Sequence, residues 1–137
     1  MVKAQEWLDK NYPLSGRNEL TSLDISNKSL EGSLRLEGFA SLKKINCSFN
    51  HKLTDLQIIG SPGLEEIRYQ YNQLQKLNLQ DFPKLKVLIC NNNNLTNLDF
   101  SQNKELERLN VMDNNFSEKD LVFLSHLVNL KDLRLGN

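Results

Sequence analysis

The sequence predicts an α/β solenoid of stacked repeats, with a parallel β-sheet on its concave face and a mostly extended, irregular convex side. The first observation is the pattern LxxLxLxxN, which is clearest at Leu85, Leu88, Cys90 and Asn93. The second is its recurrence, because the first leucines of successive copies lie 21 to 24 residues apart. These leucines are Leu20, Leu42, Leu64, Leu85, Leu106 and Leu130. A repeat of this length buries its apolar face only against its neighbours, so the repeats must stack.

Residues 1–19 stand outside the repeat and are expected to form an N-terminal capping helix and linker. Four of them follow helical spacing before Pro13 ends the run, namely Ala4, Trp7, Leu8 and Tyr12. The first rung of a solenoid has no neighbour on one side and needs a cover, so we expect Trp7 to be a capping residue. An exposed tryptophan used for recognition is the alternative. Residues 20–137 then form the solenoid, as about five repeats plus a truncated sixth.

Each repeat is expected to begin with a strand whose fourth and sixth residues point inward. The third, fifth and seventh residues then face solvent on the concave side, because side chains alternate along a strand. The ninth residue turns the chain and is asparagine in repeats two to five, at Asn50, Asn72, Asn93 and Asn114. We expect a buried ladder, in which each amide bonds backbone groups of adjacent turns. Lys28 takes this position in repeat one, where its long stem can reach solvent.

The convex side carries a second alternating pattern, which is too short for helices. Its members are Leu53, Leu56 and Ile58, then Leu74, Leu77 and Leu79, then Leu95, Leu98 and Phe100, with Leu30, Leu34 and Leu36 stretched by one residue. We expect extended segments or short strands that form a second parallel ladder. Phe39 and Phe82 alternate with Ser61 and Asn103 at one convex position, and large and small side chains should interdigitate there.

Repeat five departs from this pattern. Ser117 can cap a helix, and three leucines follow at near-helical spacing, Leu121, Leu124 and Leu127. We therefore expect one convex helix of about ten residues near the C-terminus. Leu130, Leu133 and Leu135 then open a sixth strand, and the sequence stops in mid-repeat at Asn137. Because a terminal repeat normally carries a polar cap, we expect this chain to be the N-terminal portion of a longer protein.

The two cysteines do not predict a disulfide. Cys47 and Cys90 occupy the same inward position two repeats apart, with Tyr69 between them. Stacking places their backbones about 9 to 10 Å apart, whereas a disulfide needs Cα atoms within about 7 Å. We expect small buried hydrophobes beside a large tyrosine. His51 and His126 are isolated and indicate no metal site, and nothing in the sequence indicates a cofactor.

Charge and hydropathy exclude several classes of partner. Seventeen basic and seventeen acidic residues cancel, and neither sign concentrates, so we expect no nucleic-acid partner. No apolar run approaches the about 20 residues of a membrane span, so we expect no membrane partner. The start MVKAQEWLDK lacks the apolar core of a signal peptide, which favours a cytoplasmic location. A secreted protein whose signal had been removed would show the same sequence.

From Leu20 to Asn137 the successive matches resemble the leucine-rich-repeat family. More narrowly, AQEWLDKNYP followed by LDISNKSLEGSL and LKKINCSFN is similar to the opening of fungal leucine-rich-repeat proteins, notably those of mycorrhizal fungi. The resemblance implies a curved or flat solenoid that presents one parallel sheet for protein recognition, usually without catalysis of its own. The irregular repeat lengths and the strand-like convex side depart from the helical horseshoes of the family.

The leading hypothesis is a non-catalytic protein-interaction scaffold that binds a partner through the concave sheet. Apolar residues gather among its outward positions, inside a charged rim to which Lys44 and Glu66 also belong. The partner-binding candidates are Phe49, Arg68, Tyr71, Val87, Ile89, Arg108 and Met112. An apolar centre with a polar rim is the layout of a binding patch. Single exposed hydrophobic residues are also normal on protein surfaces, so a role in covering the sheet stays open.

Two further hypotheses have a different character. The chain can be a structural N-terminal cap or spacer of a larger protein, whose binding site or catalytic domain lies beyond residue 137. An enzyme is not indicated, because no nucleophile with a base, no phosphate loop and no buried carboxylate pair emerges. We also expect a homodimer through the uncapped C-terminal end, where the strand edge lies beside exposed leucines.

Overall fold

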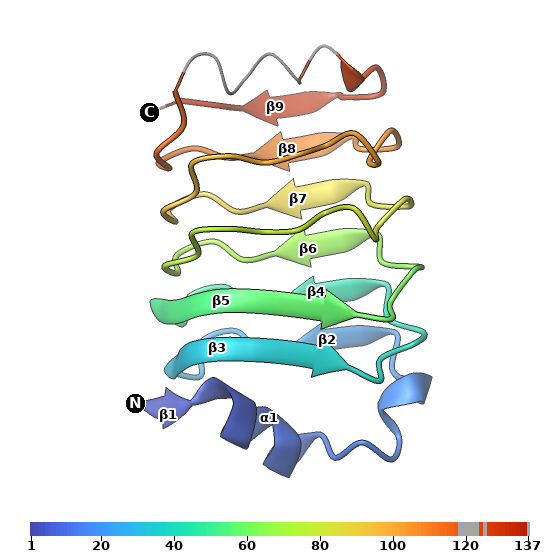
Figure 1. Cartoon of the computed structure of the whole chain (residues 1–137), viewed down its shortest axis with the longest axis vertical. Helices are drawn as coiled ribbons and strands as arrows, with labels where there is room; N and C mark the ends of the chain where they lie inside the picture. The colour runs from blue at the N-terminus through green and yellow to red at the C-terminus, as the bar shows by residue number, and fades with distance from the viewer. Residues whose placement is uncertain (118–123, 125, 137) are drawn as a thin grey trace.

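Two parallel sheets run along the solenoid, one on each side of a shared apolar core (Figure 1). The computed structural model describes residues 1–117, 124 and 126–136. Its six-stranded sheet takes one short strand from each repeat. The strands are β2 (Ser22–Asp24), β4 (Lys44–Asn46), β6 (Glu66–Arg68), β7 (Val87–Ile89), β8 (Arg108–Asn110) and β9 (Asp132–Arg134). This is the sheet expected on the concave side, and we call its solvent-facing surface the strand face.

Neighbouring strands of this sheet are parallel and in register, so equivalent positions of the repeats form rows across it. The third-position row is Ser22, Lys44, Glu66, Val87, Arg108 and Asp132. The fifth-position row is Asp24, Asn46, Arg68, Ile89, Asn110 and Arg134. Fourth-position residues such as Ile67 and Leu88 lie between these rows and are buried. The predicted α/β solenoid, its parallel sheet and its strand register are confirmed.

The return side of the solenoid forms a second sheet only in its first part. β1 (Val2–Lys3), β3 (Leu30–Glu37) and β5 (Lys52–Ile59) pair in parallel, in that order. Residues 74–79 and 95–100 keep the predicted alternation of buried and exposed side chains, but within the described residues they form no strands. The second ladder is thus shorter than predicted. Apolar alternation fixes which side chains face the core, and it does not require neighbouring backbones to pair.

The return sheet has one irregularity. Gly32 of β3 pairs with Leu53 of β5, but Ser33 pairs with Asp55, so Thr54 of β5 has no partner in the register. Gly32 has a φ of 86°, a left-handed conformation that glycine adopts without steric cost. Thr54 therefore forms a local bulge on β5, opposite Gly32 and Ser33, and Leu53 and Leu56 on either side of it stay buried.

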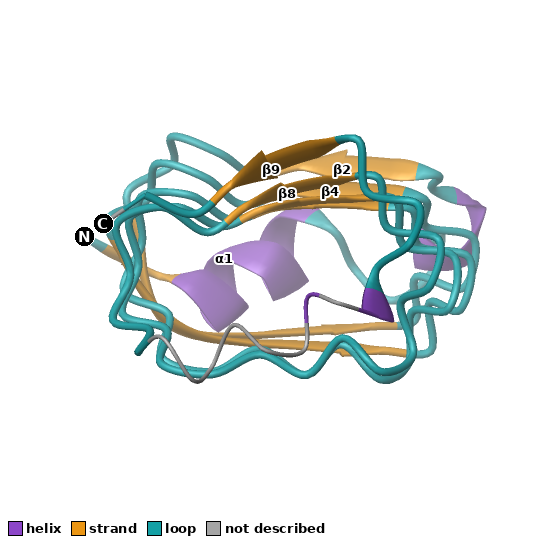
Figure 2. Cartoon of the chain, turned by 90° about the horizontal axis from the view of Figure 1, so that it is seen from above, coloured by secondary structure: helices purple, strands orange, loops and turns teal. Residues whose placement is uncertain are grey.

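Helix α1 (Ala4–Asn11) covers the N-terminal end of the solenoid. Figure 2, which looks along the solenoid, shows α1 between the two strand layers. Ala4 and Leu8 are buried, and Trp7 is partly buried against the core, as predicted for a capping residue. The Trp7 and Tyr12 rings lie 6.1 Å apart. The sequence did not predict that β1, just before the helix, pairs with β3 and ties the cap to the return sheet.

A buried arginine joins this cap to the first repeat. Arg17 opens a short 3₁₀ turn (Arg17–Glu19), and its side chain is only 3% exposed. Its guanidinium donates to the Tyr12 carbonyl at 2.6 Å, the Glu37 carbonyl at 3.0 Å and the Asp9 carboxylate at 3.0 Å. It also lies over the Phe39 ring, 5.0 Å from the centroid. These contacts satisfy a buried charge that would otherwise be costly.

The asparagine ladder is present as predicted. The Asn50 side chain donates to the carbonyls of Ile25 and Cys47 and accepts from the backbone N–H groups of Lys28 and Leu30. Asn93 and Asn114 bond the backbone in a similar way, each accepting from one N–H group of the neighbouring repeat. The Lys28 side chain is exposed, as its place at the end of the ladder predicts.

Asn72 is an exception within the ladder. Its amide donates to the Cys47 carbonyl at 3.0 Å, yet its buried side-chain oxygen has no hydrogen-bond partner in the described part of the chain. The repeat beside it has two residues, His51 and Lys52, between its ladder asparagine and the next leucine, where the other repeats have one. His51 has a φ of 71°, and its backbone N–H donates to the Tyr71 carbonyl at 3.1 Å.

The core contains the predicted mixture of large and small side chains. Phe39, Ser61, Phe82 and Asn103 are all buried along one row. Ser61 donates to the Phe39 carbonyl at 2.8 Å, and Asn103 donates to the Phe82 carbonyl at 3.0 Å. Each of these carbonyls thus accepts a second bond, beside the one from the backbone N–H of Leu42 or Leu85.

Cys47 and Cys90 lie in the core as free thiols, in the inward row that also contains Tyr69. Burial raises the pKa of the Cys90 thiol to about 12. Burial, followed by the charge of Asp24, raises the pKa of Cys47 well above its ordinary value. Both thiols are therefore held in the neutral form near neutral pH.

The C-terminal part of the chain continues the core. Leu127 is buried, and Phe116 and Leu124, which precede it in the sequence, are partly buried and pack against the core. The helix predicted after Ser117 falls largely on residues 118–123 and 125, which lie outside the described residues. Leu133 on β9 is 42% exposed, since β9 is the last strand of the sheet. The homodimer through this end stays a prediction. Among the described residues, no helix has the length and apolar character needed to cross a membrane.

Candidate functional site

The eighth position of each repeat, where the chain leaves the strand face, has an unusual backbone. Residues at this position in repeats one to five have φ between 55° and 59°. They are Asn27, Phe49, Tyr71, Asn92 and Asp113. Asparagine and aspartate tolerate this left-handed region, but a bulky aromatic residue there is an outlier. Repeats two and three thus carry an aromatic residue where the backbone favours a small polar one.

These two aromatic residues form one exposed feature. The Phe49 and Tyr71 rings stack with their centroids 4.8 Å apart and their planes 14° apart. They are 37% and 39% exposed, and His51 lies against the edge of Phe49 at 6.4 Å. The register of the repeats brings the rings together, because equivalent positions of adjacent rungs lie about 4.8 Å apart. We call Phe49 and Tyr71 the aromatic pair.

A hollow of about 270 Å³ extends from the aromatic pair across the strand face. It is lined by Phe49, Arg68, Gln70, Tyr71, Ile89, Asn91, Arg108, Leu109, Asn110, Asp132 and Arg134. The lining passes from aromatic residues in repeats two and three, through Ile89 in repeat four, to arginines in repeats five and six. We call it the strand-face hollow.

Five of the seven residues predicted to bind a partner line this hollow, namely Phe49, Arg68, Tyr71, Ile89 and Arg108. Val87 and Met112 lie on the same sheet outside it, and both are partly buried. The Val87 side chain stands between Glu66 and Arg108 in the third-position row. The predicted rim residue Glu66 bonds Arg68 at 2.8 Å, so this arginine is held in place by its own repeat.

The prediction missed the remaining lining residues, including Gln70, Asn91 and Asn110. Asp132 and Arg134 could have been found, because they are the third and fifth residues of the truncated sixth repeat. Arg108 and Arg134 each lie 3.7 Å from an oxygen of Asp132. The side-chain oxygen of Gln70 is buried and meets no donor within the described residues. The hollow thus combines apolar surface, cationic groups and an unpaired acceptor.

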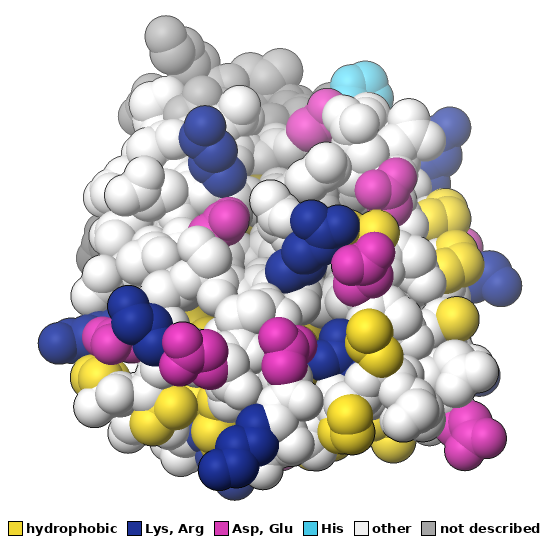
Figure 3. Space-filling model, turned by 60° about the horizontal axis from the view of Figure 1, so that its bottom comes forward, with side chains coloured by type: hydrophobic (Ala, Val, Ile, Leu, Met, Phe, Trp, Pro, Cys, Tyr) yellow, Lys and Arg dark blue, Asp and Glu magenta, His cyan; other side chains and the backbone are white. Residues whose placement is uncertain are grey.

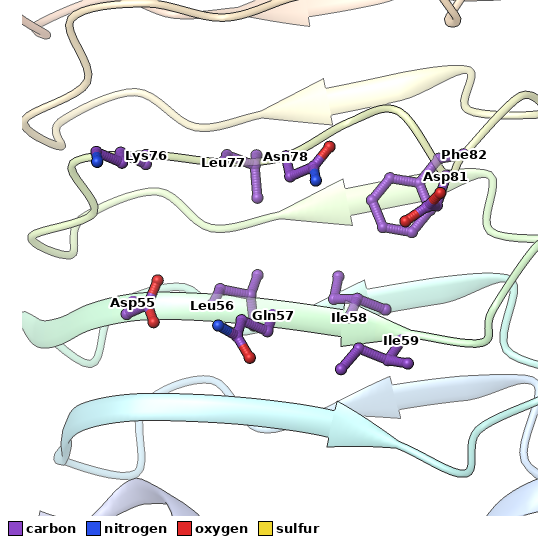
Figure 4. Close-up of a pocket in the computed structure, with 10 residues that line it drawn as sticks. All are labelled: Asp55, Leu56, Gln57, Ile58, Ile59, Lys76, Leu77, Asn78, Asp81 and Phe82. Carbon is purple, nitrogen blue, oxygen red and sulfur yellow. The ribbon is translucent and has the colours of Figure 1, made fainter.

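A second hollow, of about 290 Å³, lies on the return side (Figure 4). It separates β5 from the return segment of repeat three, and its lining includes Asp55, Ile59, Lys76, Asp81 and Phe82. Its position has a structural cause, because return-side strand pairing ends at β5 and the next segment does not pair with it. The strand-face hollow is the better functional candidate, since it adjoins an aromatic pair that the backbone does not favour.

Charged side chains of one sign do not gather at the N-terminal end of the solenoid. Figure 3, in which the N-terminal end comes forward, shows basic and acidic side chains interspersed and apolar side chains in small groups. Among the described residues, no three His, Cys, Asp or Glu side chains gather in a way that could hold a metal ion.

Solved structures from one bacterium share this architecture, whereas the chain matches no protein-family model and no curated protein. The functional domain of InlJ from Listeria monocytogenes, which includes a cysteine ladder, matches with a TM-score of 0.76 and 24% identity, over 85% of this chain and 26% of that one. The internalin InlF from Listeria monocytogenes strain 4b F2365 matches with a TM-score of 0.60 and 19% identity, over 91% of this chain and 50% of that one.

This chain therefore spans about a quarter to a half of the length of these structures. They give no support to the fungal resemblance, which stays a prediction. At these identities the likeness concerns the fold alone. Together with the repeat pattern, the in-register strands and the asparagine ladder, it shows that the chain has a leucine-rich-repeat fold.

Proposed function

We propose that the chain is a non-catalytic protein-interaction scaffold whose partner binds over the strand-face hollow. The observation that carries this proposal is the aromatic pair, which stays half-exposed in a left-handed backbone. Such a conformation costs on the order of 1 to 3 kcal/mol for a non-glycine residue, and strain of this kind gathers at functional sites. Asn27, Asn92 and Asp113 show that the fold itself accepts less strained residues there.

The composition of the hollow fits a protein partner. Aromatic residues and arginine are enriched where protein interfaces concentrate their binding energy, and this hollow contains both types. Its 270 Å³ is small and open to solvent along the sheet, which suits a protruding side chain or an extended segment. The buried thiols of Cys47 and Cys90 are neutral near neutral pH and give no support to thiolate catalysis.

The test compares changes to apolar residues on the two opposite sides of the solenoid. Tyr71→Ser combined with Ile89→Ser removes apolar surface from the strand-face hollow, and Ile59→Ser removes it from the return-side hollow. A partner protein isolated on the wild-type chain is titrated against each version by calorimetry. We expect the double variant to bind at least ~1 to 2 kcal/mol more weakly, and Ile59→Ser to bind like the wild type.

Circular dichroism and urea titration check that each variant remains folded. Loss of binding in Ile59→Ser alone would place the partner on the return side. Unchanged affinity in both variants would instead favour the structural role, in which the chain is a cap or spacer for a site elsewhere in a larger protein.

A further inference from the structure

We infer that the strand-face hollow recognises a carboxylate side chain of its protein partner, which Arg108 and Arg134 bind, next to an apolar side chain that covers Ile89. This inference rests on the proposed function and refines it, because it gives the chemistry of the partner segment. The occupant is an extended stretch of another protein that carries an aspartate or glutamate near an aromatic or aliphatic residue.

The first argument is the local charge of the hollow. Arg68, Arg108 and Arg134 line it, and Asp132 is the acidic residue in the lining. Arg68 is already paired with Glu66 at 2.8 Å. Arg108 and Arg134 share the single carboxylate of Asp132, so one positive charge at this end is not balanced. The chain as a whole has no net charge, so this excess is a property of the site.

The second argument is that the two guanidinium groups have free donors. Each lies 3.7 Å from Asp132 through its Nε atom, which is too long for a hydrogen bond, and neither makes another one within the described residues. They are 49% and 62% exposed. A guanidinium has five N–H donors in a planar fork that fits a carboxylate through two parallel bonds. A carboxylate brought by a partner can therefore be held by both arginines.

The third argument is that the charges immediately before β8 and β9, just outside the hollow, are already matched. Lys131 pairs with Glu107 at 3.4 Å on the adjacent edge of β8 and β9. The unbalanced pair is thus confined to the third and fifth positions of these strands, facing the hollow. This confinement favours one carboxylate at a defined place over a diffuse attraction to acidic surfaces.

The spacing of the hollow indicates how the partner segment is arranged. Ile89 and Arg134 occupy the fifth position in repeats four and six, two rungs apart. Two rungs span about 10 Å, which an extended peptide covers in about three residues. The buried, unpaired oxygen of Gln70 lies in the same hollow and can accept a backbone N–H group of that segment.

The experiment selects partner segments from random sequences, so the natural partner need not be identified first. A random peptide library displayed on phage is panned against the full chain, and fluorescein-labelled copies of the selected peptides are titrated by fluorescence anisotropy. We expect an aspartate or glutamate within about two to four residues of an aromatic or aliphatic residue. Arg108→Gln combined with Arg134→Gln should weaken binding by at least about tenfold, and added salt should also weaken it.

Arg35→Gln is the matched control, because Arg35 is an exposed, ion-paired arginine on β3, outside the hollow. It should bind the peptides like the wild type. Changing the acidic peptide residue to its amide should weaken binding to the wild type but not to the double arginine variant, since both changes remove the same contact. A peptide whose acidic residue is replaced by lysine should regain affinity for Arg134→Glu.

Each other outcome contradicts the inference. Recognition of a carboxylate is contradicted if no peptides are recovered or if the recovered peptides contain no acidic residue. It is also contradicted if the wild type and the double arginine variant bind the peptides equally. If binding is lost in Tyr71→Ser combined with Ile89→Ser but not in the arginine variants, the proposed function stands and only this inference fails. If neither pair of changes matters, the peptides bind elsewhere and both fail.

Discussion

Phe49 and Tyr71 stack 4.8 Å apart while both keep a φ of 59°. The stacking gives back part of the energy that the left-handed backbone costs, since aromatic pairs contribute about 0.5–1.5 kcal/mol beyond their buried area. Most of each side chain is also buried, and this burial offsets more of that cost. The pair is therefore close to neutral for the fold, and its exposed surface is free to serve recognition.

This balance predicts the effect of replacing both aromatic residues by asparagine. The free energy of unfolding, measured by urea titration, should change by less than about 1 kcal/mol, because relief of backbone strain at both residues offsets the lost stacking and the lost burial of the rings. Asp113→Phe is the control, since it places an aromatic residue at φ 55° without an aromatic neighbour in the adjacent repeat. It should destabilise the chain by about 1–2 kcal/mol. A loss above about 3 kcal/mol in the asparagine variant would show that the pair stabilises the fold.

The asparagine ladder predicts unequal costs at two of its positions. Asn50→Ala leaves the buried N–H groups of Lys28 and Leu30 without their acceptor and should cost about 1–3 kcal/mol. Asn72→Ala should cost about 1 kcal/mol less, because the side-chain oxygen of Asn72 accepts no bond. Urea titration measures both values. Equal losses would mean that backbone N–H groups do not depend on the ladder oxygens.

Arg17 predicts how strongly the N-terminal cap is fixed. Arg17→Met removes two hydrogen bonds to buried backbone carbonyls and should cost about 2–3 kcal/mol in the free energy of unfolding. Asp9→Asn should cost less, about 1 kcal/mol, because the side-chain oxygen of asparagine can still accept a bond from Arg17 and residue 9 is 60% exposed. Hydrogen exchange should show faster exchange of α1 amides in Arg17→Met. Equal stability of the two variants would contradict the role assigned to Arg17.

The two cysteines predict a dependence on pH. The unfolded thiol of Cys90 ionises near 9.0, whereas the folded thiol has a pKa of about 12. The unfolded state therefore loses its proton first, and the free energy of unfolding should fall as the pH rises from about 9 towards 12. At pH 8 a thiol reagent should react with the native chain only as fast as the chain unfolds. In urea the same reagent should react with both thiols. Rapid reaction of the native chain would contradict their burial.

Much of the fold follows directly from the sequence. The leucine spacing gives the strand register, the inward rows and the asparagine ladder, because each depends on a residue type at a fixed position of the repeat. Arg17 could not be found in this way. It occurs once in a linker. Its stabilising contacts are with Tyr12, Glu37 and Phe39, which only the fold brings together.

The candidate site shows where pattern reasoning stops. The outward third and fifth positions were assigned correctly, whereas Ser48 at the seventh position of repeat two is buried. The repeat pattern does not say which outward side chains line one hollow, and Val87 and Met112 fall outside it. Asn27, Asn92 and Asp113 carried a signal for the left-handed eighth position, since small polar residues favour it. The strain on Phe49 and Tyr71 becomes visible only once those backbone angles are known.

The central claim is that a partner segment binds across the strand-face hollow. Chemical-shift mapping of the isotope-labelled chain with a peptide selected on it tests this claim most directly. We predict that the largest amide shifts fall in residues 68–71, 89–91, 108–110 and 132–134, in segments that line the hollow. Shifts confined to residues 55–59 and 76–82, around the return-side hollow, would contradict it.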